Sequence, residues 1–277
     1  MVLLTTTEIA ERLEEVDVIH LTRQVEICRE IFPQHEVLAH RIDHGVAAVT
    51  LPLFGRKLNH VVGFGMGGSV STQDLVTIEG LYSDKNVSAE IDLCSHAHPT
   101  ALQVLASNGY AANGWLNNYV RILTDNDLQD QVVPGIEIAR VSSESFDEFI
   151  RCSVAGFKDN GRPELLLETL ARIATSRSDT TLYFAMIDGK IAGSGGMAKI
   201  ETSTGKVAHF YIDSTLPEYR GRGIQSALIR ARVSDARRAG FDLASVGVRP
   251  GTGSARNIER SGFALAYVKA SFLRANK

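Results

Sequence analysis

The chain has 277 residues, and its 44% hydrophobic and 22% charged side chains are the balance of a soluble globular protein. This composition excludes a disordered chain and a collagen-like repeat. A disulfide scaffold is excluded as well, because the three cysteines are odd in number and far apart. The net charge of −3 is unevenly divided, since residues 1–135 hold 8 basic and 17 acidic side chains and residues 136–277 hold 21 and 15. The basic second half suits a phosphate-bearing ligand, and the acidic first half would repel nucleic acid.

The start of the chain and its apolar runs carry no targeting or membrane signal. Residues 1–12, MVLLTTTEIAER, lack a basic segment, and only a three-residue apolar run precedes the threonines. No run approaches the about 18 consecutive apolar residues of a membrane-spanning helix. We therefore expect a cytoplasmic protein with no membrane or nucleic-acid partner. No dimerisation signature is present, so the sequence does not indicate an oligomeric state.

Hydrophobic periodicity predicts helices alternating with strands in the first half. Helices are expected at 7–32, 73–82 and 99–107, and strands at 37–42, 46–51, 59–64, 88–93 and 115–123. The polar, acidic segment that follows ends in Pro134-Gly135, which is typical of a linker.

The second half shows a clearer order of elements. Helices are expected at 143–155, 163–175, 223–239 and 254–260, and strands at 136–141, 181–187, 190–200, 206–213, 242–248 and 264–272. Asp188-Gly189 predicts a hairpin between two of the strands, and Gly240 ends the third helix. This order predicts an α/β domain with a mixed sheet.

The two halves match each other at an offset of 153 residues. The offset places Gly109 on Gly262 and the strand 88–93 on residues 241–246. A period this long excludes a solenoid repeat. It predicts two copies of one fold, at residues 1–130 and 136–277.

The segment from Thr215 to Ile229, TLPEYRGRGIQSALI, places a glycine-rich turn between a strand and an amphipathic helix. Gly221 and Gly223 allow a sharp turn and a close approach to a ligand. The first N–H groups of the helix lack intrahelical partners and lie at the positive end of its dipole. Gly-x-Gly alone is also typical of an ordinary strand–helix turn, but with Arg220 and Arg222 the longer string favours a pyrophosphate site.

The string Arg220-Gly-Arg-Gly-Ile-Gln225 resembles the acetyl-CoA signature Arg/Gln-x-x-Gly-x-Gly/Ala of the GNAT superfamily of N-acetyltransferases. Gln225 stands where the signature has Gly or Ala, and we expect its side chain to point off the helix. The run from Arg249 to Phe263, RPGTGSARNIERSGF, is similar to a GNAT branch with Pro-Gly-Ser-x-Ser-x-Arg-Asn before Gly-Phe. The resemblance covers residues 136–272 and extends weakly to the first half, which looks like a degenerate copy.

The resemblance implies two GNAT-like acyl-CoA N-acyltransferase domains in tandem, the second of which binds acetyl-CoA as co-substrate. Acetyl-CoA would lie between strands 206–213 and 242–248, and a small-molecule or protein amine would attack its thioester directly. A backbone N–H on residues 206–215 would hold the oxyanion. The residues expected at the acetyl-CoA site are Asp213, Ser214, Thr215, Arg220, Gly221, Arg222, Gly223, Ile224, Gln225 and Ser226.

The general acid of many family members is missing. They carry a Tyr four residues before the Gly-Phe glycine, where this chain has Ile258, and Gly251 replaces a frequent Asn. A thiol with a pKa near the ~8.5 of cysteine leaves as thiolate with little help. Ser254 or a water molecule can then deliver the proton. The missing residues also favour an alternative, a weak or inactive CoA-binding sensor or scaffold on a GNAT frame.

The candidate base is His209. Strand alternation places it on one face with Tyr211 and Asp213. Histidine, with a pKa near ~6.5 in model peptides, suits a proton relay from an ammonium, although a half-buried strand histidine is the alternative interpretation. Tyr267 and Glu218 are weaker candidates.

Two further patterns are assigned no function. Residues 63–68 match Gly-x-Gly-x-x-Gly between a strand and a helix, which is also typical of a dinucleotide site. No run of parallel βα units surrounds them, and the offset places Gly68 on Gly221, so we interpret them as a decayed acetyl-CoA turn. Seven of the eight histidines precede residue 99, but none of the cysteines has ligand spacing, so we expect no metal. Cys152 is expected to be a packing residue.

Overall fold

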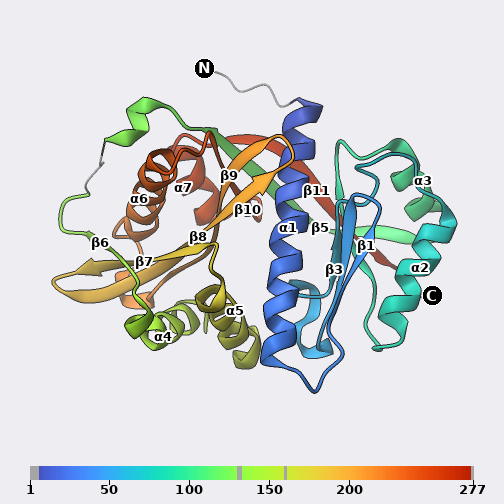
Figure 1. The fold of residues 1–277 in the computed structure, drawn as a ribbon, viewed down its shortest axis with the longest axis horizontal. Coiled ribbons are helices and arrows are strands. Elements are labelled where there is room, and N and C mark those ends of the chain that lie inside the picture. The colour runs from blue at the N-terminus through green and yellow to red at the C-terminus, as the bar shows by residue number, and fades with distance from the viewer. Residues whose placement is uncertain (1–5, 130–132, 159–160, 276–277) are drawn as a thin grey trace. The chain divides into compact units, whose positions relative to one another are not determined.

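The computed structural model describes residues 6–129, 133–158 and 161–275 (Figure 1). The chain forms two compact units. The first unit comprises Met1–Asn118 and Leu265–Lys277, and the second comprises Tyr119–Ala264. In the described residues, no helix is both long enough and apolar enough to cross a membrane.

The first unit is a mixed sheet with helices on both faces. Its strands lie in the order β1-β2-β3-β4-β11-β5. Helix α1 packs on one face of the sheet, and α2 and α3 pack on the other around a core that includes Tyr82 and Leu105 (Figure 1). The elements are α1 (Thr7–Ile31), β1 (Leu38–Ile42), β2 (Gly45–Val49), β3 (His60–Val62), α2 (Thr72–Ser83), β4 (Glu90–Cys94), α3 (Pro99–Ser107), β5 (Tyr110–Ile122) and β11 (Ala264–Arg274).

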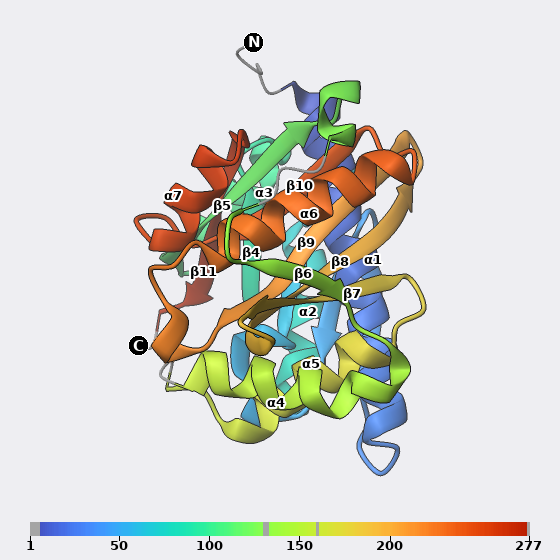
Figure 2. The ribbon, with the colours of Figure 1, turned by 90° about the vertical axis from the view of Figure 1, so that its left-hand side faces the viewer.

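The second unit has the same layered plan. Its strands lie in the order β5-β10-β9-β8-β7-β6, with β9 and β10 parallel. Helices α6 and α7 cover one face and α4 and α5 the other (Figure 2). The elements are β6 (Glu137–Arg140), α4 (Phe146–Phe157), α5 (Glu164–Ser176), β7 (Thr180–Ile187), β8 (Lys190–Thr202), β9 (Gly205–Thr215), α6 (Ile224–Arg238), β10 (Leu243–Val248) and α7 (Gly253–Arg260).

The predicted elements are confirmed, as is the α/β class with a mixed sheet. Asp188 and Gly189 have φ of 50° and 71°, the two positive values that a tight hairpin turn requires. The largest error concerns β5, which begins at Tyr110 and not at residue 115. Its early residues are largely exposed, so they lack the apolar alternation by which strands are recognised.

The offset of 153 holds in the structure. It places α2 on α6, β4 on β10 and α3 on α7. Strand β11 of the second half, however, lies almost wholly in the first unit, where Lys269 pairs with Cys94 of β4. Strand β5 continues from the first unit into the second after Asn118, and Leu123, just after β5, donates its N–H to the Asp242 carbonyl. The compact units therefore assign β11 and the last residues of β5 differently from the division into 1–130 and 136–277, which stays a prediction about the two copies of the fold.

Candidate functional site

The turn between β9 and α6 is open. A short 3₁₀ turn at Pro217–Tyr219 follows β9, and Gly221 and Gly223 have φ of 77° and 86°. A Cβ added at Gly221 would meet no atom within 4 Å, and one at Gly223 would meet only Ile136, at 3.9 Å. The positive φ values therefore account for glycine at these two positions, because a larger side chain would meet no close neighbour there.

The N-terminus of α6 offers hydrogen-bond donors to an anion. Gly223 is the N-cap, and it supplies no side-chain acceptor for the first turn of the helix. The first turn contains no acidic residue. Its N–H groups and the positive end of the helix dipole therefore remain for a ligand such as a phosphate.

Two exposed arginines, Arg220 and Arg222, lie in this turn. Arg220 is exposed, and its Nη2 donates to the Gly156 carbonyl at the end of α4, 3.2 Å away. The Arg222 guanidinium lies 5.5 Å from the centre of the Tyr219 ring. In the same unit, burial and the neighbouring Arg249 cation lower the pKa of Arg162. The Arg249 cation thus acts on Arg162, a relationship that the sequence analysis missed because the two residues are 87 positions apart.

Gln225 points off α6, as expected, and its side chain contacts α7. Its Nε2 donates to Ser254 Oγ at 2.7 Å, and its Oε1 accepts from Asn257 Nδ2 at 2.9 Å. The Ser254 oxygen is therefore an acceptor toward Gln225, and the hydroxyl proton stays available for donation. Asn257 belongs to the segment from Arg249 to Phe263 that resembles a GNAT branch, but the sequence spacing did not predict its hydrogen bond to Gln225.

Strand β9 contains a β-bulge next to the turn. Tyr211 pairs with Gly196 and Ser214 pairs with Ser194, so two residues of β9 stand opposite one residue of β8. Ile212, in the bulge, has a φ of 55°. Such a bulge bends a strand and increases its twist.

The two parallel strands pair only before the bulge. Their register runs from Val207↔Leu243 to His209↔Ser245, whereas β10 continues to Val248. The segment of β9 from Phe210 onward is thus outside the ladder with β10. This is the place where the sequence predicted the acetyl-CoA gap.

The bulge overturns one sequence prediction. Alternation placed Asp213 on the face of His209 and Tyr211, but its carboxylate turns to α6 and accepts from Arg232 Nη1 and Nη2 at 2.6 and 2.8 Å. His209 and Tyr211 do share a face, with stacked rings 6.5 Å apart. The prediction failed because one extra residue in a strand reverses every later side chain.

His209 lies at the last pair between β9 and β10. Its side chain is buried, and Nδ1 is 3.0 Å from Ser245 Oγ. Tyr211 follows on the same face, with its hydroxyl 2.8 Å from Thr180 Oγ1. Burial raises the pKa of Tyr211 to about 12, so its phenol stays protonated at neutral pH.

The remaining predicted site residues divide by exposure. Ser214 is buried, with its hydroxyl 2.9 Å from that of Ser194, and Ile224 is buried in the core, so only their backbones can meet a ligand there. Thr215 and Ser226 are half-buried. Burial raises the pKa of Cys152, although the Ser194 and Ser214 hydroxyls oppose it, which keeps the thiol neutral as expected of a packing residue.

The other candidates for acid and base lie elsewhere. Ile258, at the family's Tyr position, is fully buried in the core. Tyr267 belongs to the first unit, where its hydroxyl donates to Glu14 at 2.6 Å. Glu218 is exposed on the 3₁₀ turn.

The glycine-rich segment of the first unit is closed by packing. A Cβ at Gly63 would lie 2.9 Å from Val18, and one at Gly65 would lie 2.8 Å from Ala101. Helix α2 has its own cap, because Ser71 accepts from the Asp74 N–H and the Asp74 carboxylate accepts from the Ser71 N–H. An acidic side chain at this helix start disfavours a phosphate. The geometry favours the interpretation as a decayed turn.

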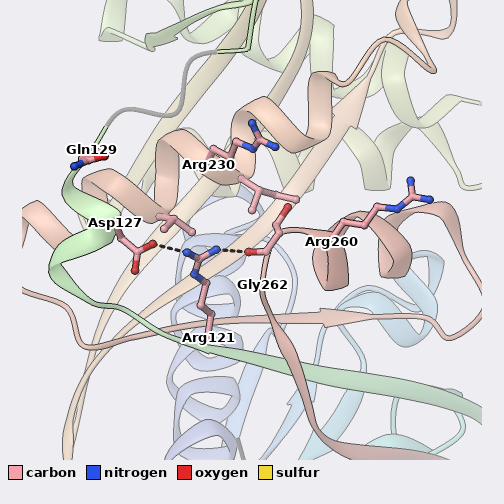
Figure 3. A pocket seen from close by; sticks show the side chains of 9 residues that line it. Arg121, Asp127, Gln129, Arg230, Arg260 and Gly262 are labelled. Carbon is pink, nitrogen blue, oxygen red and sulfur yellow. Dashed lines mark hydrogen bonds and ion pairs between the residues drawn. The ribbon is translucent and has the colours of Figure 1, made fainter. Parts of the chain in front are cut away.

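A cavity of about 240 Å³ lies elsewhere in the second unit (Figure 3). The Arg121 guanidinium lies beside it, between Asp127 and the Ser261 carbonyl. None of the predicted acetyl-CoA residues lines this cavity, whose walls are Arg121, Asp127, Gln129, Ile229, Arg230, Val233, Arg260, Ser261 and Gly262. Over the described part of the chain, no group of three or more His, Cys, Asp or Glu side chains could hold a metal ion.

Comparison with protein families gives one match. Residues 144–263 match the sequence model of the acetyltransferase (GNAT) family. This span contains the bulged strand, the glycine turn and α6. Residues 144–263 are a GNAT domain. No curated protein sequence matches the chain.

Solved structures extend the GNAT fold beyond this domain. A GCN5-related N-acetyltransferase from Kribbella flavida is 15% identical with a TM-score of 0.64, and the match covers 92% of this chain and 96% of that one. A GCN5-related N-acetyltransferase from Sphaerobacter thermophilus is 16% identical, with a TM-score of 0.59 over 84% and 78%. A tandem GNAT protein from the clavulanic acid biosynthesis pathway is 12% identical, with a TM-score of 0.58 over 86% and 82%. The fold of most of the chain is thus that of GNAT proteins.

Proposed function

We propose that the GNAT domain transfers the acetyl group of acetyl-CoA to an amine. The observation that carries this proposal is the helix start at Gly223, which has no side-chain cap and follows a strand that leaves its parallel neighbour. The turn offers donors and cations to a pyrophosphate, and the strand offers backbone groups to an extended chain. Acetyl-CoA contains a pyrophosphate and an extended pantetheine chain. The turn and the strand that would bind these two groups follow each other in the protein in the matching order.

Each part of acetyl-CoA has a set of partners in this proposal. The pyrophosphate takes the N–H groups of residues 221–226, with Arg220 and Arg222 beside it. The pantetheine follows the backbone of β9 from Asp213 to Thr215, which lies outside the ladder with β10. Arg162 and Arg249 add positive potential to the GNAT domain, which favours an anionic ligand.

The chemistry is direct attack of the amine nitrogen on the thioester carbonyl. A C–N bond forms, and the oxyanion that develops accepts a hydrogen bond from a backbone N–H of β9. The intermediate then collapses with loss of the CoA thiolate, and the nitrogen loses its proton. The protein's main contribution is to hold both reactants in place.

His209 and Ser254 are the proposed proton carriers. His209 is fixed by Ser245 at the point where β9 and β10 separate, and it takes the proton of the amine through water. Ser254, whose oxygen accepts from Gln225, gives its proton to the leaving thiolate and takes one back from a water molecule. Ile258 cannot supply one, because it is an apolar side chain in the core.

The acceptor is proposed to be a cationic amine, on a small molecule or a protein. The support is the excess of acidic over basic side chains in residues 1–135. Equal rates on lysine-like, polyamine-like and neutral amines would contradict this part of the proposal.

The experiment that tests the function is the release of CoA thiol from acetyl-CoA with and without an amine panel. Slow release that rises on addition of an amine supports a transferase. The buried Ile258 favours a second candidate, a CoA-binding sensor without catalysis. Binding of acetyl-CoA with no release on any amine would support that candidate and contradict the transferase.

A further inference from the structure

Helix α6 carries an arginine with no solvent exposure. The side chain of Arg232 is 0% exposed, and its guanidinium lies 4.6 Å from the Phe210 ring. Nε donates to the Leu228 carbonyl at 3.0 Å and Nη1 to the Gly196 carbonyl at 2.9 Å. Nη1 and Nη2 also form the bidentate pair with Asp213. A fully buried arginine is rare and costs desolvation energy, so these contacts need an explanation.

The partners of Arg232 lie on both of the strands that form the bulge. Asp213 is one of the two residues of β9 that stand opposite Gly195 of β8, and Gly196 follows Gly195 on β8. A Cβ at Gly195 would lie 2.8 Å from Asp213 Oδ1 and 3.3 Å from Arg232 Nη1. Only a glycine leaves room for the ion pair at this point. We refer to Gly195, Asp213 and Arg232 as the bulge clamp.

The bulge has a conformational cost that the bulge clamp offsets. Ile212 is β-branched and has a φ of 55°, a region that such residues rarely adopt. In an unbulged strand, Asp213 would turn to the opposite face and leave the Arg232 cation buried without its carboxylate. Breaking a buried ion pair in this way is strongly unfavourable. The pair therefore selects the bulged register over the regular one.

Selection of this register has a consequence for β10. The ladder between β9 and β10 ends at the pair His209↔Ser245, one residue before Phe210, whose ring lies under the guanidinium. We propose that Arg232 is a positioning residue, which holds β9 in its bulged register and so keeps the backbone from Phe210 onward available to acetyl-CoA. Because Arg232 is fully buried, it acts only through the strand. This inference rests on the proposed function.

The test replaces both residues of the ion pair between Arg232 and Asp213. Arg232→Met alone would leave the Asp213 carboxylate, which is only 16% exposed, without its arginine, so a loss of binding could follow from unfolding. The double variant Arg232→Met/Asp213→Leu substitutes apolar side chains for both partners, which is often neutral for stability. Arg121→Met/Asp127→Leu applies the same substitutions to another ion pair of the second unit, away from the bulge, as the matched control.

The expected result separates stability from binding. The double variant at the bulge should unfold near the temperature of the parent protein but bind acetyl-CoA at least about tenfold more weakly, since small misplacements at a site have large effects. Amide exchange at residues 210–214 should change in this variant and not in the control. Binding within about twofold of the parent in the folded double variant would overturn the inference.

A second variant keeps the test decisive if the double variant does not fold. Gly195→Ala leaves both charges in place and presses a methyl group against the Asp213 carboxylate. Weaker acetyl-CoA binding by the folded variant supports the inference, and parental binding overturns it. Gly80→Ala, at a glycine with no atom within 4 Å of an added Cβ, is its control. If the parent itself binds no acetyl-CoA, the proposed function fails, whereas the exchange at residues 210–214 still tests the bulge clamp.

Discussion

Gln225 on α6 donates a hydrogen bond to Ser254 on α7, with Nε2 and Oγ 2.7 Å apart. The acetyl-CoA signature has Gly or Ala at this position, neither of which can make the bond. The contact links the turn proposed to bind phosphate with the residue proposed to protonate the thiolate. Asn257 fixes the other end of the amide at 2.9 Å, so the orientation of Gln225 is determined by two bonds.

Removal of the Ser254 hydroxyl tests its role as proton donor. Ser254→Ala should lower kcat about tenfold and leave the Kd for acetyl-CoA unchanged, because the hydroxyl acts only as the thiolate leaves. Gln225→Ala, which restores the signature residue, should lower kcat less, since Ser254 keeps its proton. Thiol release at saturating acetyl-CoA measures both. An unchanged kcat in Ser254→Ala would show that water delivers the proton.

Two substitutions in the turn should weaken acetyl-CoA binding. Arg220→Ala removes a cation beside the phosphates and should raise the Kd about tenfold, since a hydrogen bond to a charged group contributes about 1.5–3 kcal/mol. Gly223→Glu places a carboxylate at the helix N-terminus, in a backbone conformation of φ 86°, and should abolish binding. Arg172→Ala, at an exposed arginine paired with Glu168, is the control. Parental affinity in both turn variants would refute the assigned site.

His209→Gln tests the proposed base. The amide is close to imidazole in size and can keep a hydrogen bond to Ser245, so the strands should stay in place. We expect kcat to fall by about 10²–10⁴, the usual contribution of general base catalysis, with an unchanged Kd for acetyl-CoA. Thiol release and calorimetry on the same preparation measure the two quantities. A variant with parental kcat would make His209 a structural residue.

The first unit should lose stability in mild acid because of His60. Burial lowers the pKa of His60 from 6.5 to about 4, with Arg56 and Lys269 adding to the effect and Asp92 opposing it. The unfolded chain therefore takes up a proton before the folded one, so stability present above pH 6.5 is lost as the pH falls toward 4. The total loss is about 3 kcal/mol, since one pKa unit corresponds to about 1.4 kcal/mol.

Urea unfolding at pH 7 and pH 5 measures this effect. The urea midpoint of the parent protein should be lower at pH 5 than at pH 7. The same difference should be much smaller for His60→Gln. An equal fall in both proteins would assign the acid sensitivity to other groups.

The sequence predicted the elements and the turn because both depend on local chemistry. Amphipathic periodicity located α6, and the glycines at 221 and 223 marked the change from strand to helix. The Asp188-Gly189 hairpin is equally local. These features need only a few neighbouring residues, so they can be recognised without knowledge of the fold.

What the sequence did not predict depends on pairing between distant segments. The bulge at Ile212 follows from the contacts of Asp213 with Arg232, 19 positions away. The placement of β11 in the first unit cannot be inferred, because its alternation would be the same beside any strand. The effect of Arg249 on Arg162 likewise joins two segments that are far apart in the chain.

Calorimetric titration of the purified protein with acetyl-CoA, with NADH as a second ligand, is the sharpest test of acetyl-CoA binding at the Gly223 turn. We expect one acetyl-CoA site per chain, because the turn at Gly223 is open whereas Gly63 and Gly65 are packed against Val18 and Ala101. Two sites per chain would contradict the interpretation of the first half as a decayed copy. No binding of acetyl-CoA, or binding of NADH in its place, would contradict the proposed function as a whole.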